Sequence, residues 1–230
     1  MKIRTLIKIF LVIAGSLCVL STAMQWPELE FYAKPTTVPL FFMLYWFSVK
    51  KIDGIFLMVL CMCFIGDIFL LTGVQDYFIY VLLSNGLCYI LLFYFLYKNH
   101  KPIEYSNTDI FYLVIFFVLW TLIVYEIYEA ISPNMGEIKP YGIIYLIILY
   151  FLFTGAVFQY ANTRSSQALW FLIAILNFVI CDSCYALDMF YINSIEFRII
   201  NAIYQLLAVF FLVKFRISSP TSLKLRDLDN

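Results

Sequence analysis

Long apolar segments, each ended by a short polar stretch, follow one another along almost the whole chain. None alternates apolar and polar positions over the length of a membrane strand, which leaves α-helices as the structure able to cross a bilayer. All but the second reach the roughly 20 residues that a crossing needs. The pattern therefore predicts an all-α integral membrane protein with about eight transmembrane helices. The segments are the N-terminal run to Met24 and residues 35–49, 52–73, 77–97, 110–130, 141–160, 167–191 and 195–215.

Two of these segments leave alternatives open. The second is short, begins at Lys34-Pro35 and contains Pro39, so we expect it to be irregular or re-entrant. Pro35 suits a first helical turn, because its missing N–H group would have no partner there in any case. The first segment is either a signal peptide, with a cleavage site at residues 21–23, or a retained helix. The distribution of charge along the chain favours a retained helix.

Composition excludes a soluble protein. The chain is 64% hydrophobic with a mean hydropathy of +0.91, and 13% of its residues are charged, against about 25% in ordinary globular domains. A formal net charge of zero provides no basic field for nucleic acid. The one histidine, His100, lies between two segments, which argues against a histidine-ligated metal or a serine–histidine nucleophile in the membrane. We expect no metal and no cofactor.

Lysine and arginine residues gather at alternate ends of the segments. Cytoplasmic loops carry the excess of these residues, so we expect both termini in the cytoplasm and the chain in the inner membrane of a bacterium. Cleavage of the first segment would instead leave seven helices and an outside start. We expect one transmembrane domain over 1–216 and a cytoplasmic tail over 217–230. The predicted inner ends hold Lys2, Arg4, Lys8, Lys50, Lys51, Lys98, Lys101, Arg164, Lys214, Arg216, Lys224 and Arg226, and the outer ends Lys34, Lys139 and Arg198.

Two aspartates lie within apolar segments, Asp67 in the third and Asp182 in the seventh. An ionised aspartate near the centre of a membrane helix costs about 2.5–3.5 kcal/mol on insertion scales, so it normally faces a bundle interior or a wet cavity. Both aspartates lie 15 positions beyond the start of segments that run in the same direction (52 to 67 and 167 to 182). A rise of 1.5 Å per residue puts both roughly 22 Å from the inner end. We interpret them as facing each other across a polar chamber.

Polar residues of two further segments reach the same level. The fourth and eighth segments run in the opposite direction, so residues near their starts lie in the outer half of the bilayer. Amides and carboxyl groups at one depth on four helices predict a chamber that opens toward the outer leaflet. The alternative is structural, because polar side chains also hold membrane helices together, at about 0.6 kcal/mol each. The residues at this level are Ser84, Asn85, Asn201 and Gln205.

The seventh segment carries a third acid near its outer end. Asp188 shares one helical face with Asn177, Cys181 and Cys184, at a spacing of whole helical turns. Asp182 lies to the side of that face. Asp188 therefore either serves the mouth of the chamber or is solvated at the end of the helix.

A weak internal repeat accompanies the acids. Lys34-Pro35 precedes Asp67, and Lys139-Pro140 opens the sixth segment before Asp182. This order is consistent with two four-helix halves related by an axis along the membrane normal.

Four short motifs stand out in chain order: Lys34-Pro35, Gly66-Asp67-Ile68-Phe69-Leu70, Cys181-Asp182 followed by Ala186-Leu187-Asp188, and Tyr204-Gln205-Leu206-Leu207. Together they resemble the YhhN family of multi-pass membrane lysoplasmalogenases and their bacterial relatives. The likeness extends from the second segment to the eighth. This chain departs from the family at Cys181, where serine is frequent, and at Gly86, three residues before Tyr89, where the family tends to have histidine.

The resemblance implies a hydrolase that cleaves the vinyl ether bond of a 1-alkenyl lysophospholipid into a fatty aldehyde and a glycerophospho head group. Two close carboxyl groups in a medium of low dielectric constant tend to hold one proton between them. One acid can then protonate the vinyl ether while the other stabilises the cation, which makes Asp67 and Asp182 the catalytic candidates. The alternative is a non-enzymatic transporter of lipids or small molecules in which the same aspartates relay protons.

The expected partner is a lysophospholipid or a related amphipathic molecule within membrane lipid. Its phosphate is expected at Lys34 or Lys139, the lysines at the predicted outer ends. The oligomeric state stays open. The further candidates for substrate binding are Asn85, Tyr89, Asp188, Asn201 and Gln205.

Overall fold

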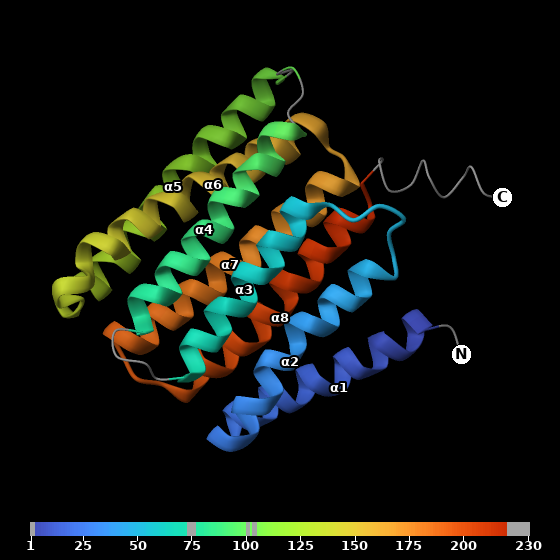
Figure 1. Cartoon of the computed structure of the whole chain (residues 1–230). Helices are drawn as coiled ribbons and strands as arrows, with labels where there is room; N and C mark the ends of the chain where they lie inside the picture. The colour runs from blue at the N-terminus through green and yellow to red at the C-terminus, as the bar shows by residue number, and fades with distance from the viewer. Residues whose placement is uncertain (1–2, 73–76, 100–101, 103–104, 220–230) are drawn as a thin grey trace.

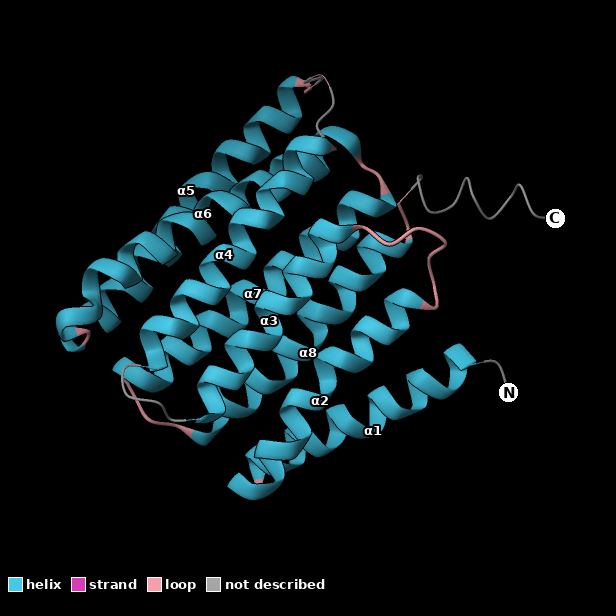
Figure 2. Cartoon of the chain, in the orientation of Figure 1, coloured by secondary structure: helices cyan, strands magenta, loops and turns pink. Residues whose placement is uncertain are grey.

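The computed structural model describes residues 3–72, 77–99, 102 and 105–219, and in these residues it is a bundle of eight long helices without strands (Figures 1 and 2). Two short 3-10 turns, Ser132–Asn134 and Gly136–Ile138, join α5 to α6. The helices are α1 (Ile3–Ala23), α2 (Pro27–Trp46), α3 (Gly54–Thr72), α4 (Tyr77–Lys98), α5 (Asn107–Ile131), α6 (Lys139–Thr163), α7 (Ser166–Phe190) and α8 (Ile195–Ile217).

Seven of these helices are long and apolar enough to cross a membrane, so the chain is an integral, multi-pass membrane protein. Seven of the predicted segments match their helices to within a few residues at each end. The exception is α2, which begins eight residues before the predicted segment (27 against 35). This helix carries Glu28, Glu30 and Lys34 in its first turns, and it is not among the seven helices that are long and apolar enough to cross a membrane.

The prediction for the second segment was wrong in two respects. A regular helix begins at Pro27, with acidic side chains in its first turn, where they are favoured by the helix dipole. Pro35 and Pro39 lie inside this helix, and each removes one backbone hydrogen bond. Packing against α1, α3 and α8 accompanies the helix along its length, so tertiary contacts outweigh the local preference of the two prolines.

The two Lys-Pro dipeptides are not equivalent. Lys34 and Pro35 lie within α2, and the Lys34 side chain is buried. Lys139 and Pro140 open α6, and the Lys139 ammonium lies 5.7 Å from the centre of the Tyr128 ring. The dipeptides therefore give no support to a repeat of two four-helix halves.

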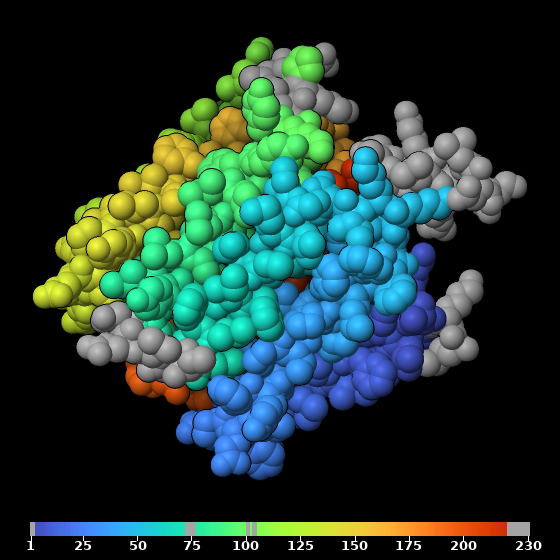
Figure 3. Space-filling model, in the orientation of Figure 1, coloured from blue at the N-terminus to red at the C-terminus, as the bar shows by residue number. Residues whose placement is uncertain are grey.

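Helices α2, α3, α4, α6, α7 and α8 all contribute to the buried core of the bundle, and α7 and α8 pack most extensively against each other. Helix α5 lies at one edge beside α6 and buries few side chains, and α1 lies at the opposite edge (Figure 1). The face made by α2, α3 and α4 covers most of α8 (Figure 3). Polar groups on α3, α7 and α8 are thereby shielded from lipid.

A partly buried ion pair ties the end of α8 to the start of α3. Asp53 accepts hydrogen bonds from the backbone nitrogens of Ile55 and Phe56, at 3.0 and 3.3 Å. Its second carboxylate oxygen lies 2.6 Å from Nη2 of Arg216, whose side chain is 10% exposed. Helix α1 begins and α8 ends on this side of the bundle (Figure 1). The cytoplasmic orientation of that side stays a prediction, and the tail after Ser219 lies outside the described residues.

Candidate functional site

Asp67 lies in α3, and its side chain is buried in the bundle interior. The side-chain amide of Gln205 in α8 donates a hydrogen bond to Oδ1 of this carboxyl group. The preceding residue, Gly66, allows α4 to approach closely, because a Cβ atom there would lie 2.8 Å from Oδ1 of Asn85 and 3.1 Å from Oγ of Ser84. The Gly-Asp pair therefore places a carboxyl group where α3, α4 and α8 meet.

Asp182 lies in α7 and accepts two hydrogen bonds at the same oxygen, Oδ2. One comes from the hydroxyl of Tyr89 in α4 and the other from the hydroxyl of Tyr145 in α6, the latter at 2.7 Å. The two tyrosine rings lie 5.5 Å apart between their centres and pack against each other. Three helices thus fix the position of this carboxyl group and supply it with two O–H donors.

Both carboxyl groups line one small cavity of about 50 Å³ among α3, α4, α7 and α8. Asn85, Asn201 and Gln205 line it as well, so the structure brings together three of the four polar residues that depth alone placed at one level. The fourth, Ser84, does not line the cavity, and its hydroxyl donates to the backbone oxygen of Val81 at 3.0 Å. The amide nitrogen of Asn201 donates to the backbone oxygen of Cys181 at 2.9 Å, which fixes α8 against α7 beside the cavity. The volume has room for a few water molecules.

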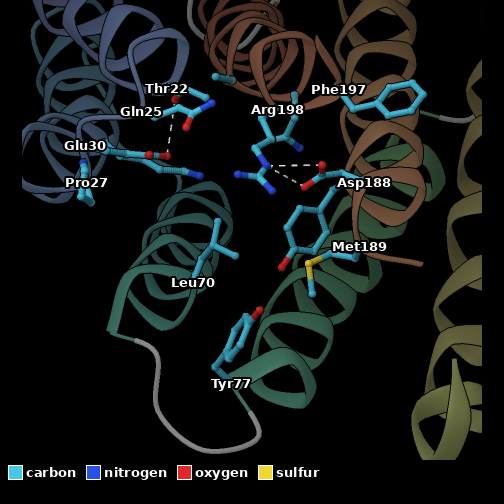
Figure 4. A pocket seen from close by; sticks show the side chains of 14 residues that line it. Thr22, Gln25, Pro27, Glu30, Leu70, Tyr77, Asp188, Met189, Phe197 and Arg198 are labelled. Carbon is cyan, nitrogen blue, oxygen red and sulfur yellow. Dashed lines mark hydrogen bonds and ion pairs between the residues drawn. The ribbon is translucent and has the colours of Figure 1, made fainter. Parts of the chain in front are cut away.

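A larger cavity of about 410 Å³ adjoins the small one and shares Leu70, Tyr185 and Asn201 with it. It lies among the ends of α1, α2, α3, α4, α7 and α8 that the charge pattern predicts to face outward. Figure 4 shows the guanidinium group of Arg198 extending into it, with Asp188 on one side and Glu30 of α2 on the other. Charged groups thus line the approach to the two aspartates.

Lys34 lies inside α2 with 5% of its surface exposed, and it lines the larger cavity. Within the described part of the chain its ammonium group forms no ion pair. It interacts electrostatically with the Asp67 carboxyl group. A buried cation of this kind normally has an anionic partner, and the cavity beside it is large enough to admit one.

One of the two interpretations of Asp188, solvation at the end of α7, is wrong. Its side chain is 8% exposed and lies 3.0 Å from Nε of Arg198, and its Oδ1 accepts a hydrogen bond from the backbone nitrogen of Ser194 at 2.9 Å. The carboxylate therefore closes the turn between α7 and α8 and holds Arg198 at the rim of the larger cavity.

The structure separates two of the predicted binding residues from the cavities. Tyr89 lines neither cavity, and it contacts the site through the hydrogen bond that its hydroxyl donates to the Asp182 carboxyl group. Lys139 lies beside Tyr128 at the start of α6 and lines neither cavity. Of the two lysines proposed for a phosphate, only Lys34 has access to the larger cavity.

Two residues of the site were missed in the sequence. Tyr145 lies six positions into α6 (139 to 145), as Asn201 lies six positions into α8 (195 to 201), so the same depth argument applies to it. Tyrosine is common throughout this chain, however, and depth does not single out one. The placement of Arg198 at an outer end stays a prediction, and its pairing with Asp188 depends on the turn between α7 and α8.

This arrangement can donate a proton, stabilise a positive charge and bind an anion. Two carboxyl groups that share a small cavity of low dielectric constant tend to carry one proton between them. Lys34 and Arg198 suit a phosphate in the adjoining cavity, because both are cations with N–H donors.

No curated protein and no solved structure matches the chain significantly. The model of the YhhN family, in contrast, matches residues 29–214. This range contains both aspartates and the residues of the small cavity, and it covers α2 to α8 except for the first two residues of α2 and the last three of α8. A match over most of the chain, together with the eight-helix fold of its described residues, establishes that the chain belongs to the YhhN family.

Proposed function

We propose that this chain is a lysoplasmalogenase-like hydrolase, which cleaves the vinyl ether bond of 1-alkenyl lysophospholipids into a fatty aldehyde and a glycerophospho head group. One observation carries the proposal: Asp67 of α3 and Asp182 of α7 line the same small cavity inside the bundle. The family to which the chain belongs includes lysoplasmalogenases. A vinyl ether opens when its outer carbon is protonated, and paired carboxyl groups suit that reaction.

The hydrogen bonds distinguish the two acids. Asp182 accepts two O–H donors at one oxygen, which favours its carboxylate form. Among the described residues, Asp67 accepts a hydrogen bond from one amide, that of Gln205, and we assign Asp67 as the general acid. The positive charge of Lys34 works against this assignment, because it favours the carboxylate form of Asp67. A phosphate bound beside Lys34 would offset that charge.

In the proposed reaction the Asp67 carboxyl group transfers its proton to the outer vinyl carbon. The π electrons of the double bond form the new C–H bond, which leaves an oxocarbenium ion opposite the Asp182 carboxylate. One water molecule adds to the inner carbon and returns a proton to Asp67. The resulting hemiacetal then breaks its bond to the ether oxygen: its hydroxyl loses a proton as the C=O bond of the aldehyde forms, and the departing oxygen gains a proton to give the glycerophospho alcohol. General acid catalysis contributes about 10²–10⁴-fold in such steps.

The charged cavity is the proposed site of the head group. Lys34 and Arg198 reach it from α2 and α8, and Asn201 lines both this cavity and the one with the two acids. A phosphate bound by the two cations would place the ether oxygen next to the small cavity, because the two volumes adjoin at Leu70 and Tyr185. The skew of lysine and arginine residues supports, as part of the proposal, a location of this cavity on the outer side of a bacterial inner membrane.

The test is aldehyde release from a 1-alkenyl lysophospholipid by the purified protein in detergent. Asp67→Asn and Asp182→Asn keep the side-chain volume and should each lower release by about 10²-fold or more. The matched control is Asp109→Asn, which changes a carboxylate at the start of α5 that pairs with Arg164 far from the cavities. Wild-type turnover in both cavity variants would refute the catalytic pair.

The transporter alternative predicts a different outcome of the same assay. A transporter releases no aldehyde in detergent and instead moves its substrate across a sealed vesicle when a proton gradient is present. Proton-coupled transport that is lost in both variants, without aldehyde release by the wild-type protein, would replace the hydrolase by the transporter.

A further inference from the structure

An apolar groove of about 350 Å³ runs between α4 and α6, on the side of these helices away from the charged cavity. Its rim consists of exposed leucine and isoleucine side chains, such as Leu83, Leu87 and Ile144. Gly86 is buried at its base, next to the half-buried Tyr145. A Cβ atom at Gly86 would meet only Cδ2 of Tyr145, at 3.8 Å, so the absent side chain deepens the groove.

The groove ends one side chain away from the candidate catalytic pair. The ring of Tyr145 lines the groove, and the hydroxyl of the same residue donates to Oδ2 of Asp182 at 2.7 Å. Asp182 in turn lines the small cavity. The order in space is therefore a charged cavity, a small cavity with two carboxyl groups, and an apolar groove.

We propose that the groove between α4 and α6 binds the hydrocarbon chain of the substrate and that Gly86 determines how long a chain it accepts. The proposal rests on the proposed function. A lysolipid has a charged head group, a reactive ether bond and an apolar chain in the same order as the three volumes. The other two volumes do not suit the chain, because one is charged and the other measures only about 50 Å³. The small cavity and the groove share no described lining residue, so the proposal requires the Tyr145 ring to shift when the substrate binds.

A second apolar groove, between α1 and α8, is a weaker candidate although it is larger, at about 550 Å³. Its α8 residues, which include Leu206 and Phe210, differ from Gln205 and Val209, which line the small cavity. None of its described lining residues bonds to either catalytic candidate. Ordinary bilayer lipid is sufficient to fill it.

The test compares a short-chain and a long-chain 1-alkenyl lysophospholipid as substrates. Gly86→Leu and Gly86→Trp fill the base of the groove and should lower kcat/KM for the long chain about tenfold more than for the short chain. Activity of Gly86→Leu on the short chain also shows that the variant folds. Val118→Trp is the matched control, because Val118 is a lipid-facing residue of α5 with 51% exposure. Equal losses on both chains, or none, would overturn the proposal.

A lysolipid with a photoreactive group at the end of its chain gives a readout that does not depend on turnover. We expect labelling of α4 and α6 at the groove in the wild-type protein and its loss in Gly86→Trp. Labelling confined to α1 and α8 would overturn the proposal. Labelling at α4 and α6 without aldehyde release would keep the groove as the site of the chain and refute the hydrolase, so the two failures are distinguishable.

Discussion

The two tyrosines that hold Asp182 provide the sharpest test of the assigned roles. Tyr145→Phe and Tyr89→Phe each remove one O–H donor from Oδ2 of Asp182 and keep the ring, so the surrounding packing is preserved. A hydrogen bond to a charged group contributes about 1.5–3 kcal/mol. Its loss shifts the shared proton from Asp67 toward Asp182, and each variant should therefore lower kcat about 10- to 150-fold.

The assay is aldehyde release in detergent, with kcat and KM measured separately for each variant. KM should change little, because neither hydroxyl lines the charged cavity. The two donors share one oxygen, so the effect of the double variant should differ from the product of the single effects, as expected for coupled groups. Tyr150→Phe is the matched control, since its hydroxyl lies on the same helix as Tyr145 and contacts Thr121 at 2.8 Å. Unchanged kcat in both single variants would refute the reasoning, and increased kcat would reverse the two roles.

Three further predictions concern the head group, the cavity and stability. Lys34→Gln and Arg198→Gln should raise KM for a lysophospholipid about tenfold each, and unchanged KM in both would remove the phosphate from the charged cavity. Gly66→Ala puts a methyl group 2.8 Å from Oδ1 of Asn85, so we expect lower kcat with a protein that still folds, and full activity would show that Asn85 is dispensable. Asp53→Ala should lower the free energy of unfolding in detergent by at least about 1 kcal/mol through loss of the helix cap alone. Asp53→Asn should lose less, because asparagine also caps helices, and equal stability of all three proteins would contradict this account.

The sequence by itself determined the class of fold and the level of the polar residues. A helix that crosses a bilayer must satisfy its backbone hydrogen bonds internally, so the length of an apolar segment is sufficient to predict such a helix. For this reason seven predicted segments match their helices, and the intramembrane acids Asp67 and Asp182 could be placed at one depth from their positions alone. The motifs around them were also sufficient to indicate the family, because they occur in a fixed order along the chain.

Only the tertiary structure decided which way the helices face and which side chains meet. Depth along a helix leaves its rotation open, so Tyr145 could not be distinguished from the other tyrosines until α6 packed beside α7 and placed its hydroxyl on Asp182. Lys34 lies close in sequence to two prolines that predict an irregular segment. Packing on three helices nevertheless keeps α2 regular and buries the lysine beside the larger cavity. Rotation and burial are set by contacts between distant segments, and the hydrophobic pattern of each segment does not contain them.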